Sequence, residues 1–302
     1  MKTELECLPC FFRQVSRTLR YAGVNGDAGR KIMRRVGEIV EQATLDQAPA
    51  RISTHLHRAL RRDTGVDPYR HLKESSTRSA LALLPRLRVS AASAPGRDPL
   101  EVAVRVAIAG NVIDFGIYEE FDLEGSLVDS LRLPLASAPY RSFVRALERA
   151  RTILYLCDNA GEIVFDRLLL DLLRAAGKDV TAVVKGSAVI NDATINDAVA
   201  AGLEESARVI DNGSDGIGTL LETCSERFLD AYRSADLVIS KGQANFETLL
   251  AEKDPRIFFL FKVKCPVVAR SLGRPEGDIV LMNGDADLSM FADSDAGFLF
   301  HG

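Results

Sequence analysis

The sequence has no long apolar run. None of its 302 residues belongs to an uncharged stretch of the roughly 20 residues that a helix needs to cross a membrane. The segment from Met1 to Glu6 also lacks the apolar core of a secretory signal peptide. We therefore expect a cytoplasmic protein that has no membrane among its partners.

Cysteine is scarce as well. Five cysteines are too few and too scattered for a disulfide scaffold, and they suit a reducing cytoplasm. Cys7 and Cys10 have the spacing of neighbours on one face of a helix. A zinc site would need about four ligands, and only His55 and His57 could complete it from the same region. Ordinary thiols are the favoured alternative.

Several ligand-binding motifs are missing. The chain contains no G-x-x-x-x-G-K-[ST] phosphate loop, and no G-x-G-x-x-G follows the first predicted strand, so a P-loop or a dinucleotide fold is unsupported. The arginines are not interleaved with aromatic residues and no zinc-finger spacing occurs, so we expect no nucleic acid partner. The sequence leaves the oligomeric state open.

The net charge of −4 is unevenly distributed. Residues 1–95 contain 17 Lys and Arg and 9 Asp and Glu, whereas the remainder contains 21 and 33. A basic region beside an acidic one could steer an anionic substrate. A solvated, arginine-rich helical surface explains the same pattern and is the preferred interpretation.

Helical periodicity dominates the first part of the chain. Apolar residues recur at helical spacing over 5–22 and 74–88, and two further helices are marked by the apolar sets around Val36 and Leu56. Strand patterns are absent there. Because 90–99 is rich in Ala, Ser, Pro and Gly, we predict a helical N-terminal domain over 1–97 and a second domain over 98–302.

From Thr152 onward, strand and helix patterns alternate. Such alternation predicts an α/β fold, with three α/β/α layers around a largely parallel sheet. Helices are also expected at 100–109 and 139–150. The predicted strands are 152–157, 180–184, 207–210, 236–240, 257–262 and 279–282, and the predicted helices between them are 162–175, 194–202, 216–231 and 243–251.

Polar residues follow several of these strands directly. Asp158 and Asn159 come after the first strand, and a glycine turn and an apolar helix follow them. Ligands of open α/β sheets bind at the carboxyl ends of strands, and hard oxygen ligands suit Mg²⁺ or Mn²⁺. Asp158 or Asn159 could equally cap the helix, and this stretch alone does not separate a cap from a metal ligand.

Lysines and further oxygen ligands follow the other strands. Lys185 and Ser187 come after the second strand, with Asp192 shortly beyond, and Lys241 and Asn245 come after the fourth. Two metal-binding carboxylates with a lysine form a set that can handle phosphate. Helix caps explain the lysines poorly, so the set favours a phosphate site.

Four short stretches of the sequence resemble the motifs of a known family, and the similarity extends over nearly the whole chain. They are 158–162 (DNAGE), 185–194 (KGSAVINDAT), 241–246 (KGQANF) and 110–116 (GNVIDFG). They resemble the signatures of the DUF89 family of metal-dependent damage-control phosphatases, related to ARMT1-like proteins. The N-terminal CLPC at 7–10 is similar to the small prokaryotic branch of that family.

The resemblance implies roles for individual residues. It implies a divalent metal, Mn²⁺, Mg²⁺, Co²⁺ or Ni²⁺, held by Asp158, Asn159 and Asp192. Lys241 maps to a phosphate-binding lysine and, with Asp158 and Asp192, to the catalytic set. As a strand-end residue, Lys241 is not expected in the core. The substrate would be a small phosphorylated metabolite such as a sugar phosphate, contacted by the set Asn111, Glu162, Ser187, Lys241 and Asn245.

Two other functions remain compatible with the sequence. One is an S-adenosylmethionine-dependent carboxyl methyltransferase, an activity ascribed to ARMT1-like relatives, for which the Ala160-Gly161 turn is thin support. The other is a non-catalytic protein that binds metal or a phosphometabolite. The favoured prediction is a metal-dependent phosphomonoester hydrolase. Whether Asp158 is only a ligand or also attacks phosphorus is open.

Overall fold

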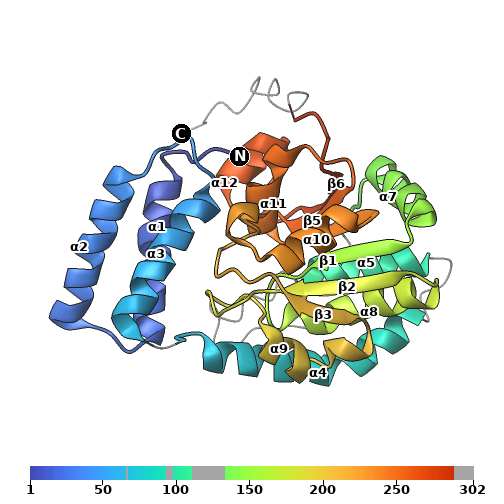
Figure 1. Cartoon of the computed structure of the whole chain (residues 1–302), viewed down its shortest axis with the longest axis horizontal. Coiled ribbons are helices and arrows are strands. Elements are labelled where there is room, and N and C mark those ends of the chain that lie inside the picture. The colour runs from blue at the N-terminus through green and yellow to red at the C-terminus, as the bar shows by residue number, and fades with distance from the viewer. Residues whose placement is uncertain (66, 93–97, 111–132, 289–302) are drawn as a thin grey trace.

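The structure is a computed structural model that describes residues 1–65, 67–92, 98–110 and 133–288. The predicted N-terminal helices are present in it, and the region after residue 150 alternates between strands and helices (Figure 1). The helices are α1 (Cys7–Tyr21), α2 (Gly26–Gln42), α3 (Pro49–Thr64), α4 (Arg70–Ala92), α5 (Pro99–Gly110), α7 (Ser137–Arg149), α8 (Glu162–Ala175), α9 (Ile195–Ala200), α10 (Glu226–Ser234), α11 (Gln243–Leu249) and α12 (Pro266–Leu272).

One six-stranded sheet forms the centre of the α/β part. Its strands are β1 (Thr152–Leu156), β2 (Asp179–Val184), β3 (Arg208–Asp211), β4 (Leu237–Lys241), β5 (Ile257–Lys262) and β6 (Ile279–Asn283). The spatial order is β3-β2-β1-β4-β5-β6, and only the β5–β6 pair of this sheet is antiparallel. Leu156 of β1 is level with Val183 of β2 and Ser240 of β4. The residues that follow these three strands therefore meet at one edge.

Side chains alternate between the two faces of the sheet, as the pleat of a strand requires. Ile153 and Tyr155 belong to a buried cluster that includes side chains of α5, α7 and α8. Leu154 and Leu156 belong to a second cluster with side chains of α10, α11 and α12. Helices thus cover both faces (Figure 1), and the predicted three-layer α/β/α architecture is confirmed.

The helices α1, α2 and α3 pack together at one end of the molecule (Figure 1). Their shared core contains Phe11, Val15, Val36 and Leu56, which confirms the helical periodicity read from the sequence. The fourth N-terminal helix, α4, packs instead against α8 and α9 beneath the sheet. The domain boundary at residue 97 stays a prediction, although α4 precedes it and contacts the α/β layers.

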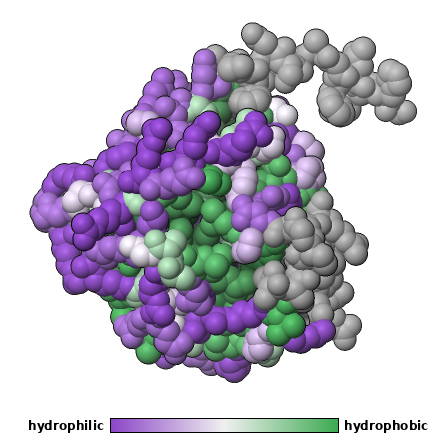
Figure 2. Space-filling view, turned by 90° about the vertical axis from the view of Figure 1, so that its right-hand side faces the viewer, coloured by the Kyte–Doolittle hydropathy of each residue, from purple (hydrophilic) through white to green (hydrophobic). Residues whose placement is uncertain are grey.

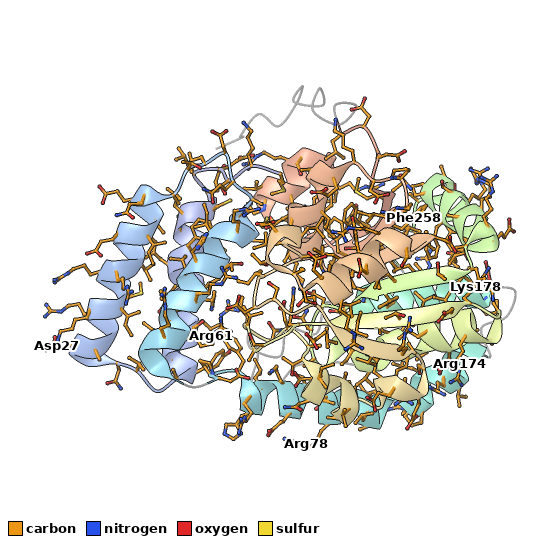
Figure 3. All side chains as sticks on the ribbon, viewed as in Figure 1. Asp27, Arg61, Arg78, Arg174, Lys178 and Phe258 are labelled. Carbon is orange, nitrogen blue, oxygen red and sulfur yellow. The ribbon has the colours of Figure 1, made fainter. Side chains whose placement is uncertain are left out.

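Helix α3 connects the helical bundle to the α/β layers. Its Thr54 Oγ1 accepts a 2.9 Å hydrogen bond from the backbone nitrogen of Ile217. Arg58 and Arg61 both pair with Asp215, and Arg58 Nη2 lies 2.6 Å from its carboxylate. Figure 3 shows Arg61 at the border between α3 and the loops of the α/β part. Half-buried ion pairs therefore fix one face of α3 against this loop.

The helix predicted at 216–231 is wrong in its first half. The helix α10 begins only at Glu226, where the Ser225 side chain caps it by accepting from the backbone nitrogen of Phe228. The preceding segment is a loop in which Gly213 and Gly218 have φ of +71°, a conformation that favours glycine. A Cβ on Gly218 would lie 2.3 Å from the carbonyl oxygen of Ala244. Close packing on α11 replaces the expected helical turns.

One face of the molecule shows both hydrophilic and apolar areas (Figure 2). Figure 2 views the face on which α7 lies and shows apolar side chains gathered near its centre, bordered by hydrophilic ones. Of the helices that the structure describes, none has the length and apolarity required to span a membrane.

Gly186 provides a test of the packing between the loops that follow β2 and β3. A Cβ there would lie 2.5 Å from the backbone carbon of Gly213, which cannot move as a side chain could. We expect Gly186→Ala to lower the free energy of unfolding by about 2–3 kcal/mol, the usual cost of overpacking. The measurement is urea unfolding followed by circular dichroism.

Gly37 in α2 is the matched control for this prediction. A Cβ at this position meets no atom within 4 Å, and its backbone φ is not positive. Gly37→Ala should therefore stabilise the protein by about 0.5–1 kcal/mol. A Gly186→Ala variant as stable as the wild type would show that the two loops are not tightly packed.

Candidate functional site

Two chain segments run side by side at the carboxyl edge of the sheet. The backbone nitrogen of Ala193 donates to the carbonyl oxygen of Asp158 at 2.8 Å, and that of Ala160 donates to Asn191 at 3.0 Å. Asn159 and Asp192 form an antiparallel bridge between these bonds. The backbone thus brings together Asp158, Asn159 and Asp192, the three predicted metal ligands.

The carboxylates of this site are buried beside each other. Asp158 is 9% exposed and Asp192 is 6% exposed. Burial raises the pKa of Asp158 to about 8, and the negative charges of Glu162 and Asp192 contribute to this shift. Burial also raises the pKa of Asp192, although Lys185 opposes the effect. Repulsion between like charges in a poorly solvated place favours a bound cation or a proton.

Asn159 is oriented by two carboxylates. Its Nδ2 donates to Asp158 Oδ2 at 3.0 Å and to Glu162 Oε2 at 3.0 Å. The amide oxygen is therefore the atom of Asn159 that can ligate a metal, as a hard divalent cation prefers. In the described ranges, no group of three or more His, Cys, Asp and Glu side chains is arranged to hold a metal. The predicted set contains only two residues of those kinds, with an amide as the third donor.

Lys241 lies in the core, contrary to the expectation for a strand-end lysine. Its side chain is fully buried, and its Nζ pairs with Glu162 Oε1 and with Asp166 Oδ1, the latter at 2.7 Å. Burial lowers the pKa of Lys241, but the carboxylates of Asp166 and Glu162 outweigh burial and leave the pKa raised. The expectation failed because β4 ends inside the three-layer core, where α8 supplies both counter-charges.

Glu162 joins the lysine to the predicted metal ligands. It is 1% exposed, and its two oxygens contact Asn159 and Lys241 respectively. Asp166, one helical turn later in α8, was not among the residues predicted for the site. Its i, i+4 spacing from Glu162 was the available signal, since such residues share a helix face. Burial raises the pKa of Asp166 to about 6 against the opposing charge of Lys241.

Asn245 fastens the ends of two strands together. Its Nδ2 donates to the carbonyl oxygens of Lys241 at 2.7 Å and Cys157 at 3.4 Å. Its Oδ1 accepts a 2.8 Å hydrogen bond from Thr219. These contacts hold β1 and β4 in register at the site, and the predicted contact of Asn245 with substrate stays a prediction.

Gly242 permits a close approach of the backbone to the acidic cluster. Its φ is +82°, and a Cβ at this position would lie 2.1 Å from Asp158 Oδ2. Only a residue without a side chain fits between the end of β4 and this carboxylate. The glycine after Lys241 therefore belongs to the architecture of the site.

A cleft of about 640 Å³ opens between α4 and the segments that follow β2. Asp158, Asn159 and Asp192 are not among its lining residues, and Lys185 connects it to them. Ser187 is exposed in the cleft, as a substrate-binding residue must be. Lys185 lines the cleft, and its Nζ lies 3.4 Å from Asp192 Oδ2. Lys73 also lines it and pairs with Asp67 at 3.2 Å and with Asp197 at 3.1 Å.

Neither lysine that lines the cleft was predicted as a site residue. Lys73 had no sequence signal because it comes from α4, far from the strand-end motifs, whereas Lys185 opens one of those motifs. The predicted substrate residue Asn111 lies outside the described residues. The cleft thus offers a place for substrate that is walled by paired cations and carboxylates.

Comparisons with known proteins identify the family of the chain. The family described as the damage-control phosphatase ARMT1-like domain matches residues 3–280. An uncharacterised protein of Methanocaldococcus jannaschii, MJ0202, is 38% identical over 290 residues, covering 93% of this chain and 95% of the relative. A protein of Pyrococcus horikoshii named damage-control phosphatase PH1575 is 35% identical, covering 93% and 98%.

Two further matches extend the comparison. A protein of Archaeoglobus fulgidus named damage-control phosphatase is 33% identical over 235 residues, covering 76% of this chain and 81% of the relative. The crystal structure of PH1575, described as a DUF89 family protein, superposes with a TM-score of 0.85 at 34% identity, covering 94% of this chain and 99% of that one. The chain therefore belongs to the DUF89 family of damage-control phosphatase ARMT1-like domains.

Proposed function

We propose that this protein is a divalent-metal-dependent phosphatase that hydrolyses small phosphate monoesters. Asp158, Asn159 and Asp192 would hold Mn²⁺, Mg²⁺, Co²⁺ or Ni²⁺. The observation that carries the proposal is the pair of buried, mutually repelling carboxylates beside a fixed amide at the carboxyl edge of the sheet. The names of the relatives from Pyrococcus and Archaeoglobus support the reaction class.

The donor set fits a hard divalent cation, since it offers carboxylate and amide oxygens only. Such an ion supplies Lewis-acid stabilisation of charge on a phosphate group when bound. The protein supplies orientation, because Glu162 holds the Asn159 amide and Lys241 in turn holds Glu162. Burial of the carboxylates excludes bulk water from the reacting centre, which strengthens each electrostatic contact there.

Lys185 and Lys241 compensate negative charges at two different places. Lys185 lines the cleft, and its buried ammonium group contacts Asp192 and donates to the carbonyl oxygen of Gly218. We propose that it turns toward the phosphate oxygens of a substrate in the cleft. Lys241 carries its charge behind the site, between Glu162 and Asp166. A direct contact of Lys241 with phosphate requires its Nζ to leave one of those carboxylates. Ser187 offers a hydroxyl to the same substrate from the cleft wall.

The cleft indicates the size and polarity of the substrate. A volume of about 640 Å³ suits a small metabolite, and its charged walls suit polar groups next to the phosphate. We therefore propose sugar phosphates or damaged phosphometabolites as the substrate class. A phosphatase assay with and without metal separates this proposal from methyl transfer and from binding without catalysis.

Removal of metal should abolish the activity. We expect hydrolysis of an aryl phosphate to stop in excess chelator and to return when Mn²⁺, Co²⁺ or Ni²⁺ is added. The reason is that the cation would stabilise the charge that develops on the phosphate group. Full turnover in a sample shown to be metal-free by elemental analysis would contradict the proposal.

Metal binding should release protons in a pH-dependent manner. Because the pKa of Asp158 without metal is raised to about 8, this carboxyl is mostly protonated at pH 7 and must ionise to ligate. We expect about one proton released per ion at pH 7 and far less at pH 9.5, with affinity rising as pH rises toward 8. Calorimetric titration in buffers of different ionisation enthalpy measures this number.

The variant Asp158→Asn is the control for the proton count. It should release fewer protons and bind metal more weakly. In the metal-free protein it should be stabilising, because a carboxyl whose folded pKa exceeds its unfolded value costs stability at any pH above the unfolded value. The gain should be present at pH 8 and should vanish near pH 4. Unchanged proton release would place the titrating group elsewhere.

Replacement of Lys241 should damage the fold as well as the activity. Lys241→Ala leaves Glu162 and Asp166 as buried carboxylates without their cation, so we expect a loss of about 3–5 kcal/mol in the free energy of unfolding. Adding Asp166→Asn to Lys241→Ala should recover part of that loss because one orphaned charge is removed. Unfolding in urea gives the comparison. A single variant as stable as the wild type would show that the lysine is not held by these carboxylates.

A further inference from the structure

Three of the five cysteines lie near one another at the core of the helical bundle, and none of them has a role in the proposed reaction. Cys7 begins α1 and is buried in the core of the helical bundle, with Cys265 packed against the same cluster. Cys10 lies one turn further along α1 and is half-buried. Burial raises the pKa of Cys7, and the charge of Glu247 and the other two thiols contribute. All five cysteines are free thiols in this structure.

The spacing and position of Cys7 and Cys10 suit a disulfide. Residues at i, i+3 in a helix have Cβ atoms about 5–6 Å apart, and a disulfide needs about 3.5–4.5 Å. A shift of about 1–2 Å closes that gap. Because Cys7 is the first helical residue, its N–H group is not bonded within α1 and donates instead to the carbonyl oxygen of Glu4 at 2.9 Å. Pro9, between the two thiols, has no N–H group to lose in this first turn.

The two thiols have different surroundings. Cys10 is the more accessible of them, and its Sγ accepts a hydrogen bond from Gln14 Nε2 at 3.6 Å. Cys7 is only 7% exposed and lies behind it on the same helix face. This is the division between an attacking thiol and a resolving thiol.

Cys265, the third thiol, connects the thiols of α1 to the carboxyl edge of the sheet. Cys265 immediately precedes α12, and its Sγ accepts from Gln243 Nε2 at 3.5 Å. The same Gln243 nitrogen donates to Glu247 at 2.9 Å, and the Gln243 oxygen accepts from the backbone nitrogen of Lys264. Gln243 directly follows Gly242 of the proposed site. Because its amide holds the Cys265 thiol, Cys265 is the less available partner for Cys7.

We propose that Cys7 and Cys10 are a redox-active dithiol that low-molecular-weight disulfides such as oxidised glutathione convert to an intramolecular disulfide. The Cys10 sulfur attacks one sulfur of the oxidant, whose S–S bond breaks, and the departing thiol takes up the Cys10 proton. The Cys7 sulfur then attacks the Cys10 sulfur of the mixed disulfide. The second thiol leaves with the Cys7 proton, so two protein thiols are oxidised and one external disulfide is reduced to two thiols.

The test is a redox titration of the full-length protein with mixtures of reduced and oxidised glutathione. After acid quenching, denaturation and alkylation, the oxidised protein should take up three alkyl groups in place of five. Trypsin cuts after Lys2 and Arg13, so both thiols fall in the peptide 3–13. In the oxidised protein that peptide should carry no alkyl group and should be lighter than the unalkylated dithiol peptide by two hydrogen atoms. Absence of a disulfide even in pure oxidised glutathione would overturn the proposal.

Serine variants assign the two roles. Cys7→Ser should accumulate a glutathione adduct on Cys10, because the resolving thiol is missing. At this pair, Cys10→Ser should react about tenfold more slowly, because only the buried Cys7 of the two thiols remains. Cys224→Ser, a change at a half-buried thiol of another core cluster, should form the disulfide as the wild type does.

Two results would replace this assignment with another. A Cys7–Cys265 linkage in the peptide map would show that the pair runs between α1 and α12. Binding of one zinc ion per chain that blocks alkylation of Cys7 and Cys10 would show a metal site in place of a redox pair. Circular dichroism of each variant confirms that it is folded before its reaction with glutathione is interpreted.

Discussion

The structure depends on the burial of several carboxylates at one edge of the sheet. Asp158, Asp192 and Glu162 lie there with little access to water, and a charge in such a place is costly without a counter-charge. Lys241 and Lys185 supply part of the compensation, one behind Glu162 and one beside Asp192. The remaining negative charge is what a divalent cation would neutralise.

Backbone geometry makes this concentration of charge possible. The parallel register levels the ends of β1, β2 and β4, and the short bridge between Asn159 and Asp192 holds the segments beyond them. Gly242 lets the end of β4 approach Asp158 without a side chain in between. Asn245 ties the carbonyl groups at the ends of β1 and β4 together. The charged site is therefore supported by neutral contacts of the backbone and of the Asn245 amide.

The helical bundle takes part in the same arrangement through α3 and α11. Ala50 of α3 donates its backbone N–H to the buried Glu247 of α11, and Thr54 of the same helix accepts from the loop after β3. Helix α11 begins immediately after Gly242. The helical bundle thus contacts, through α3, an element that starts at the edge of the proposed site.

The sequence by itself determined the positions of most helices and strands, and it located most of the polar residues that follow the strands. Periodicity is a local property, so 3.6-residue and alternating patterns located the helices and strands, and the parallel sheet followed from their alternation. The position of Asp158 and Asp192 after neighbouring strands was likewise readable, because strand ends of a parallel sheet share an edge.

Only the tertiary structure decided how the charges pair. Lys241 and Asp166 are 75 residues apart in sequence, and Lys73 and Asp197 are 124 apart. No local pattern predicts such contacts, since they depend on the way α8 and α4 pack on the sheet. The same reason explains the loop that replaced the predicted turns before α10, where glycines with positive φ pack on α11. Local periodicity thus identifies the elements, whereas long-range packing decides which buried charges meet.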